Sequence, residues 1–210
     1  MNRQILKLLA DGYHQVAGLF TDMKKLISVV GLLLLAGCST QKQPQSEPPY
    51  VKQNYSESDP AAKLSVSQFA NVVKSIYPAY QISHSNDGGE VRFLPNDVKA
   101  DTKFVPNNNW YSIKIIKDSN TENWKGLVVE VFNKESYEQS KTVAFKDCQR
   151  ILGNIDNRVP TVIYELEDRI NKTETESSKN LSSVHRYGYT VYYDASHYNE
   201  GYPVSCMVGI

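Results

Sequence analysis

The sequence predicts an α+β domain with a mostly antiparallel sheet and about three helices on one face, in the order α-β-β-β-β-α-α-β-β. Apolar residues recur at helical spacing in three separate segments of the chain. Short runs rich in β-branched and aromatic residues lie around these segments, several of them next to turn sequences. Links of the hairpin type dominate, which favours antiparallel pairing, and no internal repeat is visible.

The first predicted element is a helix that begins after Ser65. Ser65 and Gln68 fit a capping box, an apolar stripe follows, and Pro78 helps to end the helix. Strands are expected at 80–84 and 90–94. The sequence Ser-Asn-Asp-Gly-Gly between them is a strong signal for a hairpin turn, so these two strands should pair with each other.

A polar stretch, 95–109, separates this hairpin from two further strands at 110–117 and 126–132. A polar turn joins the two strands, which predicts a second hairpin. The strand at 126–132 is almost entirely apolar, and strands of that composition are buried on both faces. We therefore expect it in the centre of the sheet.

Two helices follow in direct succession. Asn133 is expected to cap the first, whose apolar stripe is interrupted by Lys141 and runs to a closing Gly153. Pro160 suits the first residue of the second helix. Residues 171–180 are polar and hold no large apolar side chain, so they are predicted to form a loop.

The last two predicted strands lie at 185–194 and 203–210. Alternation in the first of them predicts that five residues share one face: His185, Tyr187, Tyr189, Val191 and Tyr193. Cys206 should point inward from the last strand, and Cys148 should point inward from a helix. A helix packed on the sheet can therefore bring the two cysteines together.

Upstream of the domain, residues 23–37 have the layout of a secretory signal. Lys24 and Lys25 precede an apolar run at 26–36, which ends in small residues. The run is shorter than the roughly 20 apolar residues that a membrane-spanning helix needs. A buried core helix is the alternative, but such a helix should show a polar face, which this run lacks.

The end of this segment, Leu35-Ala36-Gly37-Cys38, resembles the lipobox of bacterial lipoprotein precursors. The resemblance implies cleavage before Cys38 and a diacylglycerol on its thiol, so a lipid anchor would hold the protein to a membrane. Because Ser39 follows the cysteine, the resemblance also implies the periplasmic leaflet of the outer membrane. A Gram-positive host would instead place the protein on the outer face of its single membrane.

The signal is complete without residues 1–22, so we expect translation to start at Met23 and the preceding residues to be an upstream over-extension. An unusually long n-region is the rival interpretation. Residues 38–63 are rich in Gln, Ser and Pro without apolar periodicity, which predicts a lipidated, disordered tether. A single α+β domain is then expected to span 64–210.

Charge and cysteine content limit the partners and the compartment. The chain holds 23 Lys and Arg and 23 Asp and Glu, and without residues 1–37 the balance is slightly acidic. Binding to nucleic acid calls for a basic face, so nucleic acid is not an expected partner. In an oxidising compartment Cys148 and Cys206 favour a disulfide, with two separate buried thiols as the alternative.

No catalytic constellation is visible in the sequence. It contains no nucleophile elbow, no zinc-protease motif and no glycine-rich phosphate loop, and its histidines lack the close spacing of metal ligands. Asp194 and His197 form a short carboxylate–histidine pairing, and ordinary surface residues are the favoured interpretation. We therefore expect no metal, no cofactor and no enzymatic activity.

Tyrosines are concentrated at 187–202, a range that holds six of the 14 in the chain. Tyrosine is enriched at interfaces, but it also favours strands, and packing within the sheet is the favoured interpretation. The tyrosines expected to be exposed, together with a neighbouring arginine, form a candidate binding face: Arg186, Tyr192, Tyr198 and Tyr202.

These features favour a membrane-anchored envelope lipoprotein whose non-enzymatic domain binds another protein, as an immunity-type protein or as an accessory of envelope assembly. Two alternatives stay open. The domain can be a periplasmic module for a small ligand or a cell-wall component, with a pocket lined by the tyrosine-rich strand. It can also be an enzyme of an unrecognised type.

Overall fold

The structure is a computed structural model that describes residues 49–99, 101–173 and 182–210. The signal at 23–37, the lipid site Cys38 and the expected start of translation lie outside the described residues. No helix in the described part of the chain is long and apolar enough to cross a membrane.

The described residues form three α-helices, seven strands and one short 3-10 helix. In chain order these are α2 (Val66–Ile76), β1 (Gln81–His84), β2 (Glu90–Leu94), β3 (Trp110–Lys117), β4 (Trp124–Phe132), α3 (Tyr137–Gly153), α4 (Val159–Thr173), β5 (Ser182–Arg186), β6 (Tyr189–Asp194), η1 (Tyr198–Glu200) and β7 (Val204–Gly209). Helix α4 extends into the predicted loop at 171–180, and the rest of that loop lies outside the described residues.

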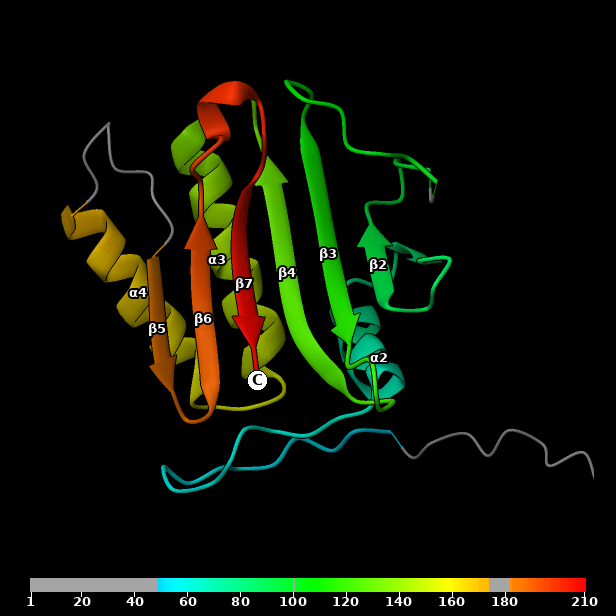
Figure 1. The fold of residues 1–210 in the computed structure, drawn as a ribbon, viewed down its shortest axis with the longest axis vertical. Coiled ribbons are helices and arrows are strands. Elements are labelled where there is room, and N and C mark those ends of the chain that lie inside the picture. Colours follow the sequence, from blue (N-terminus) through cyan, green and yellow to red (C-terminus); the bar gives the residue numbers. More distant parts are fainter. Residues whose placement is uncertain (1–48, 100, 174–181) are drawn as a thin grey trace, which may run out of the picture. The chain divides into compact units, whose positions relative to one another are not determined.

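All seven strands form one antiparallel sheet in the spatial order β1-β2-β3-β4-β7-β6-β5. Figure 1 shows the three helices on the same side of this sheet, behind the strands in that view. The predicted α+β class and the antiparallel pairing are therefore confirmed. Strand β4 is the middle strand of the seven, as its apolar sequence predicts.

The larger of two buried clusters, the main core, lies between the helices and one face of the sheet. Ile113, Leu127 and Val208, from three neighbouring strands, point into it and are at most 1% exposed. Phe145 of α3 and Val162 of α4 meet them from the helix layer and are fully buried. Full burial of one such side chain contributes about 1.5–3 kcal/mol, so this shared layer holds the helices on the sheet. No helix of the described residues labelled in Figure 1 lies over the opposite face of the sheet, and we call it the open face.

The local sequence predicts the N-terminal caps of α2 and α3, and the structure confirms only the first of them. The predicted capping box of α2 is confirmed: Ser65 Oγ accepts from the Gln68 backbone N–H at 3.1 Å, and the Gln68 side chain accepts from Ser65 at 3.2 Å. The predicted cap of α3 is wrong, because Ser136 and not Asn133 is the N-cap. The Asn133 side chain instead accepts the Glu135 backbone N–H at 2.9 Å, which stabilises the turn before the helix.

The single strand predicted at 185–194 is wrong, since this region is the hairpin β5–β6. The chain reverses at Tyr187 and Gly188, which have positive φ values of 56° and 77°. A two-residue turn of this kind changes which alternate residues point to a given face. Val184 therefore faces the helices and is buried, whereas His185, predicted for that face, is exposed.

The predicted disulfide is confirmed. Cys148 of α3 is bonded to Cys206 of β7, and their Cα atoms are 6.5 Å apart. Both side chains are fully buried in the core. The bond thus connects the helix layer covalently to a strand next to the centre of the sheet.

A segment upstream of the first helix also belongs to the folded unit. Residues 49–62, which we call the strap, run along one end of the sheet, at the bottom of Figure 1. Ala62 is 1% exposed, and its carbonyl accepts the indole N–H of Trp124 at 3.2 Å. The sequence predicts a disordered tether up to residue 63, but the described part of that segment lies against the domain. The folded unit therefore begins before the predicted residue, Leu64.

Candidate functional site

The open face carries a continuous row of side chains across five strands. The strand register pairs Arg92 with Lys114 and Lys114 with Val128. It then pairs Val128 with Met207 and Met207 with Tyr192. Directly opposed residues lie about 4.5–5.5 Å apart at Cβ, so neighbouring side chains in the row touch. The row changes from two cations on β2 and β3 to three apolar or aromatic side chains on β4, β7 and β6.

Val128, Met207 and Tyr192 form what we call the apolar patch. Val128 and Met207 are half-buried among their neighbours on the sheet, and Tyr192 is 36% exposed. On one side the patch borders Gly126 and Gly209, which are paired directly and present no side chain. A solvated face of an antiparallel sheet normally carries polar residues, so this patch departs from the common pattern. Tyrosine, methionine and arginine are the residue types enriched where proteins contact one another.

The four residues of the predicted binding face do not lie together. Tyr192 is on the open face, and Tyr202 lies in the loop before β7 with 44% of its surface exposed. Tyr198 is half-buried, with two aromatic ring centroids at 5.0 Å from its own. Arg186, at the end of β5, has a nitrogen 3.9 Å from a carboxylate oxygen of Glu165 on α4, so it belongs to the helix side. Two of the four therefore remain on the open side of the sheet.

A cavity of about 440 Å³ opens on this side of the sheet, at the cationic end of the row. Trp110, Lys114 and Glu130 line it from the sheet. Phe104 and Tyr202 line it from two loops, and the Phe104 ring centroid lies 5.8 Å from that of Trp110 and 5.5 Å from that of Tyr202. An aromatic wall thus stands directly beside charged groups.

Glu130 is the centre of a polar network at this cavity. Its carboxylate accepts hydrogen bonds from Trp110 Nε1 at 3.2 Å, Ser112 Oγ at 2.8 Å and Lys114 Nζ at 2.5 Å. Burial alone would raise the pKa of Glu130, but the charge of Lys114 and these hydrogen bonds outweigh it and hold the pKa below its ordinary value. The carboxylate is therefore ionised and engaged at neutral pH, so it is unsuited to donate a proton as a general acid.

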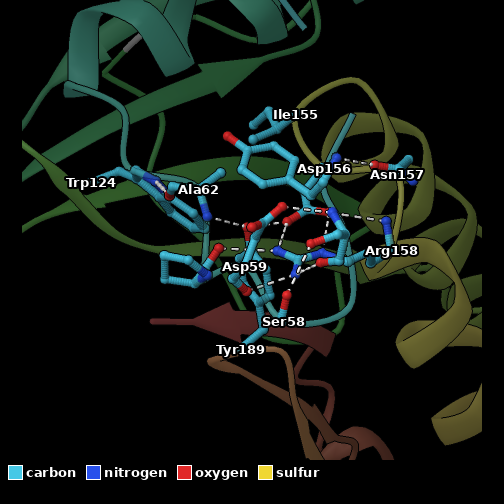
Figure 2. A network of polar contacts seen from close by, with 12 residues as sticks. Ser58, Asp59, Ala62, Trp124, Ile155, Asp156, Asn157, Arg158 and Tyr189 are labelled. Atoms are coloured by element: carbon cyan, nitrogen blue, oxygen red, sulfur yellow. Dashed lines mark hydrogen bonds and ion pairs between the residues drawn. The ribbon is translucent and has the colours of Figure 1, made fainter. Parts of the chain in front are cut away.

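A second polar network joins the strap to the loop between α3 and α4 (Figure 2). The Arg158 guanidinium donates to the backbone oxygens of Ser56 at 2.6 Å, Asp59 at 2.7 Å and Pro60 at 3.0 Å. The same group pairs with the Asp156 carboxylate at 3.0 and 2.7 Å. We call Asp156 and Arg158 the latch, because Arg158, paired with Asp156, binds three backbone carbonyls of the strap.

The latch is buried. Asp156 is 0% exposed and Arg158 is 6% exposed. The rings of Tyr55 and Tyr187 each lie 5.0 Å from the guanidinium carbon. The Tyr189 hydroxyl donates to Asp156 at 3.0 Å and accepts a strap N–H at 2.7 Å. Buried charges are tolerated when they are paired and hydrogen-bonded, and both charges of the latch meet that condition.

Sequence reasoning missed both the strap and the latch. The available signal was the presence of Tyr50 and Tyr55 in an otherwise polar segment, because disordered segments are poor in aromatic residues. In the structure the Tyr50 hydroxyl donates to the Ile155 carbonyl at 2.5 Å. Gly188 permits the close approach of the strap, since a Cβ there would lie 3.3 Å from Ala61. The burial of Arg158 depends on the docking of the strap, so the sequence around residue 158 does not predict it.

The latch should weaken in acid. Burial alone would raise the pKa of Asp156, but hydrogen bonds from Arg158 and Tyr189 outweigh it and hold the pKa below its ordinary value. The pair therefore stabilises the fold above the unfolded pKa of about 3.9, and this contribution is lost as the pH falls through the folded pKa. We expect the difference in unfolding free energy between wild type and Asp156→Asn to be largest near neutral pH and to shrink below about pH 4. Denaturant titrations across this range measure it, and a difference independent of pH would contradict the assignment.

The described residues contain no group of three or more His, Cys, Asp or Glu side chains arranged to hold a metal ion. The one carboxylate–histidine pairing noted in the sequence has other partners. Asp194 accepts hydrogen bonds from Ser196 at 2.9 and 2.7 Å, and His197 Nδ1 lies 3.2 Å from a carboxylate oxygen of Glu200. Asp194 and His197 thus serve the turn between β6 and β7.

Comparison with known proteins adds no assignment: no family model, no curated protein and no solved structure matches this chain.

Proposed function

We propose that this protein is a lipid-anchored lipoprotein of the bacterial cell envelope, and that its non-enzymatic domain binds another protein through the open face. The anchor is a lipid on Cys38, and the location is the periplasmic leaflet of the outer membrane. An immunity-type protein or an accessory of envelope assembly fits this plan.

The apolar patch is the observation that carries the binding proposal. Val128, Met207 and Tyr192 lie side by side on three neighbouring strands, and none of the helices α2, α3 and α4 covers them. The next row of the register, Glu130, Ser205 and Asp194, gives the patch a polar border. An apolar centre with a polar rim is the usual composition of a protein interface. A partner of that kind explains why the open face is not polar throughout.

Two observations support the envelope location. The lipobox-like sequence that ends at Cys38 follows an apolar run of signal length. The Cys148–Cys206 bond is of a type that persists in oxidising compartments and is rare in the cytosol. Both point to a protein that functions after export.

Site-specific cross-linking in the full-length, membrane-bound protein tests this proposal. Benzoylphenylalanine replaces Tyr192 on the open face or, as the matched control, Tyr164, which is 66% exposed on α4 in the opposite layer. We expect an adduct of one defined mass from position 192 and none from position 164. Met207→Lys should remove that adduct, because it places a charge in the apolar patch.

The controls separate the anchor from the binding face. A clickable fatty acid supplied to the same cells should label the wild type and leave Cys38→Ala unlabelled. Adducts of equal yield from positions 192 and 164, or none from position 192, would overturn the binding proposal. Label retained by Cys38→Ala would overturn the proposed anchor at Cys38. The proposal that the open face binds a protein would then depend on the cross-linking result alone.

A further inference from the structure

The cavity beside the apolar patch has walls that are set by the fold. The loop after β2 and the loop before β7 meet where the Asn107 N–H donates to the Gly201 carbonyl at 3.0 Å. Gly201 has a positive φ of 86°, and a Cβ there would lie 2.4 Å from the Asn107 side-chain oxygen, so only glycine fits this contact. The junction holds Phe104 and Tyr202 with ring centroids 5.5 Å apart. The aromatic wall is therefore formed before any ligand arrives.

Among the described residues, the ion pairs at this cavity leave one of its lining cations without a carboxylate partner. Lys114 is paired with Glu130 at 2.5 Å, and Arg92 is paired with Glu90 at 2.8 Å. Lys103 also lines the cavity and is exposed, and no ion pair reaches it from residues 49–99, 101–173 or 182–210. A group that complements this arrangement carries one negative charge next to an apolar or aromatic part.

From this arrangement we infer that the cavity receives an acidic side chain and an adjacent aromatic side chain from a segment of the protein partner. The carboxylate pairs with Lys103, and the aromatic ring packs on Phe104 and Tyr202. The inference rests on the proposed function, since it names the part of the partner that the open face selects. The partner's remaining contacts then fall on the apolar patch, which the row through Lys114 joins to the cavity.

The surface next to this cavity further limits which residues the partner's segment can carry. A second cavity of about 530 Å³ adjoins the first and shares Arg92 and Lys103 with it. Its lining adds Glu90 and Asp101, so a second carboxylate entering there would meet like charges. Serine, asparagine and histidine side chains line the rest of it. The segment selected by the two cavities therefore carries a single acidic residue and continues with polar ones.

The two tryptophans of the chain allow a direct test. The indole N–H of Trp110 lies at the cavity and binds Glu130, whereas that of Trp124 binds Ala62 at the strap and serves as an internal control. Full-length protein labelled with ¹⁵N-tryptophan is titrated in detergent with acetyl-Glu-Phe-amide. We expect the Trp110 signal to shift with a dissociation constant of the order of millimolar, as befits a contact of two residues, and the Trp124 signal to stay in place.

Matched probes and variants decide which groups matter. Acetyl-Gln-Phe-amide and acetyl-Glu-Ala-amide should each bind about three- to five-fold more weakly, because one lacks the charge and the other lacks the ring. Lys103→Glu should weaken acetyl-Glu-Phe-amide by a similar factor. Lys146→Glu makes the same charge change on α3, where Lys146 is exposed, and should leave binding within two-fold of wild type. An unchanged Trp124 signal shows that each variant is folded.

Three results would overturn the inference: no shift at Trp110, equal binding of the glutamine peptide, or tighter binding of N-acetylmuramic acid than of the dipeptide. Cross-linking distinguishes this failure from failure of the proposed function. If Tyr192 adducts form and survive Lys103→Glu, the open face binds a protein and the cavity does not select its acidic segment. If no adduct forms while Trp110 responds to the dipeptide, the cavity stands and the protein-binding proposal falls.

Discussion

Replacing Arg158 with leucine is expected to lower the free energy of unfolding by about 3–5 kcal/mol, the usual cost of removing one partner of a buried ion pair. The variant leaves the Asp156 carboxylate, which is 0% exposed, without its cation. It also removes the donor from the strap carbonyls of Ser56, Asp59 and Pro60. For a domain of this size the midpoint of thermal unfolding should fall by roughly 10 °C, which circular dichroism measures.

Two further variants separate the contributions. Arg169→Leu is the matched control, because Arg169 is about half exposed and its pair with Glu165 is 3.4 Å long, so the expected cost is below about 1 kcal/mol. Replacing both Asp156 and Arg158 with leucine removes the unpaired charge and should recover part of the loss. An Arg158→Leu protein as stable as Arg169→Leu would show that the latch does not hold the strap.

Proteolysis measures independently whether Arg158→Leu releases the strap. Lys63 is exposed and directly follows the strap, whose neighbour Ala62 is buried. A protease needs a flexible stretch on both sides of the bond that it cuts, so the docked strap should protect the Lys63–Leu64 bond. We expect trypsin to cut there several-fold faster in Arg158→Leu than in Arg169→Leu.

Loss of the Cys148–Cys206 bond is expected to have an effect of similar size. The two cysteines are 58 positions apart, and closing a loop of that length stabilises a fold by about 4 kcal/mol on the chain-entropy account. Cys148→Ala/Cys206→Ala should therefore unfold at a midpoint roughly 10 °C lower than the oxidised wild type. Denaturant titration gives the corresponding free energy.

Reductant provides the control for this second prediction. Dithiothreitol should bring the wild type close to the double variant, and it should leave the double variant unchanged. The remaining difference between them measures the cost of the smaller side chains, because both sulfur positions are fully buried. A wild type whose stability does not respond to reductant would show that the bond contributes little.

Local rules account for the elements that the sequence predicts well. The capping box at Ser65, the turn before Glu90 and the apolar run of β4 each depend on residues within a few positions of one another. The disulfide follows from two such local patterns, since the stripe of α3 buries Cys148 and the alternation of β7 buries Cys206. Contacts of this kind need no knowledge of the rest of the chain.

The elements that the sequence does not reveal depend on distant contacts. The residues around Tyr187 and Gly188 continue the alternation of the strands on either side, so the pattern conceals the turn, which becomes visible only when both strands pair. The strap is polar and rich in proline, and it docks because the latch, some 100 positions later in the chain, supplies donors for its carbonyls. The composition of a segment does not reveal the turn or the docking of the strap, because both depend on residues elsewhere in the chain that pair or pack with that segment.

The open face shows the same limit for the candidate site. Apolar β4 suggests burial on both faces, but Val128 lies on the face opposite to the helices α2, α3 and α4. The candidate residues Arg186 and Tyr192 lie on opposite faces of the sheet because of the turn at Tyr187 and Gly188. The turn places Arg186 on the helix side and Tyr192 on the open face. The row from Arg92 to Tyr192 joins five strands that are spread over residues 90–209, so no single window of the chain contains it.

With the proposed lipid anchor, the strap would also set how far the domain can stand from a membrane. If the chain is anchored at Cys38, a tether that continued to residue 63 would permit about 85 Å of separation when fully extended. With the strap docked from residue 49 onward, only residues 39–48 remain between the anchor and the domain, and ten residues span at most about 35 Å. With the proposed anchor at Cys38, the docked strap would therefore keep residue 49 within about 35 Å of the lipid surface, and a partner would have to approach the membrane to reach the domain.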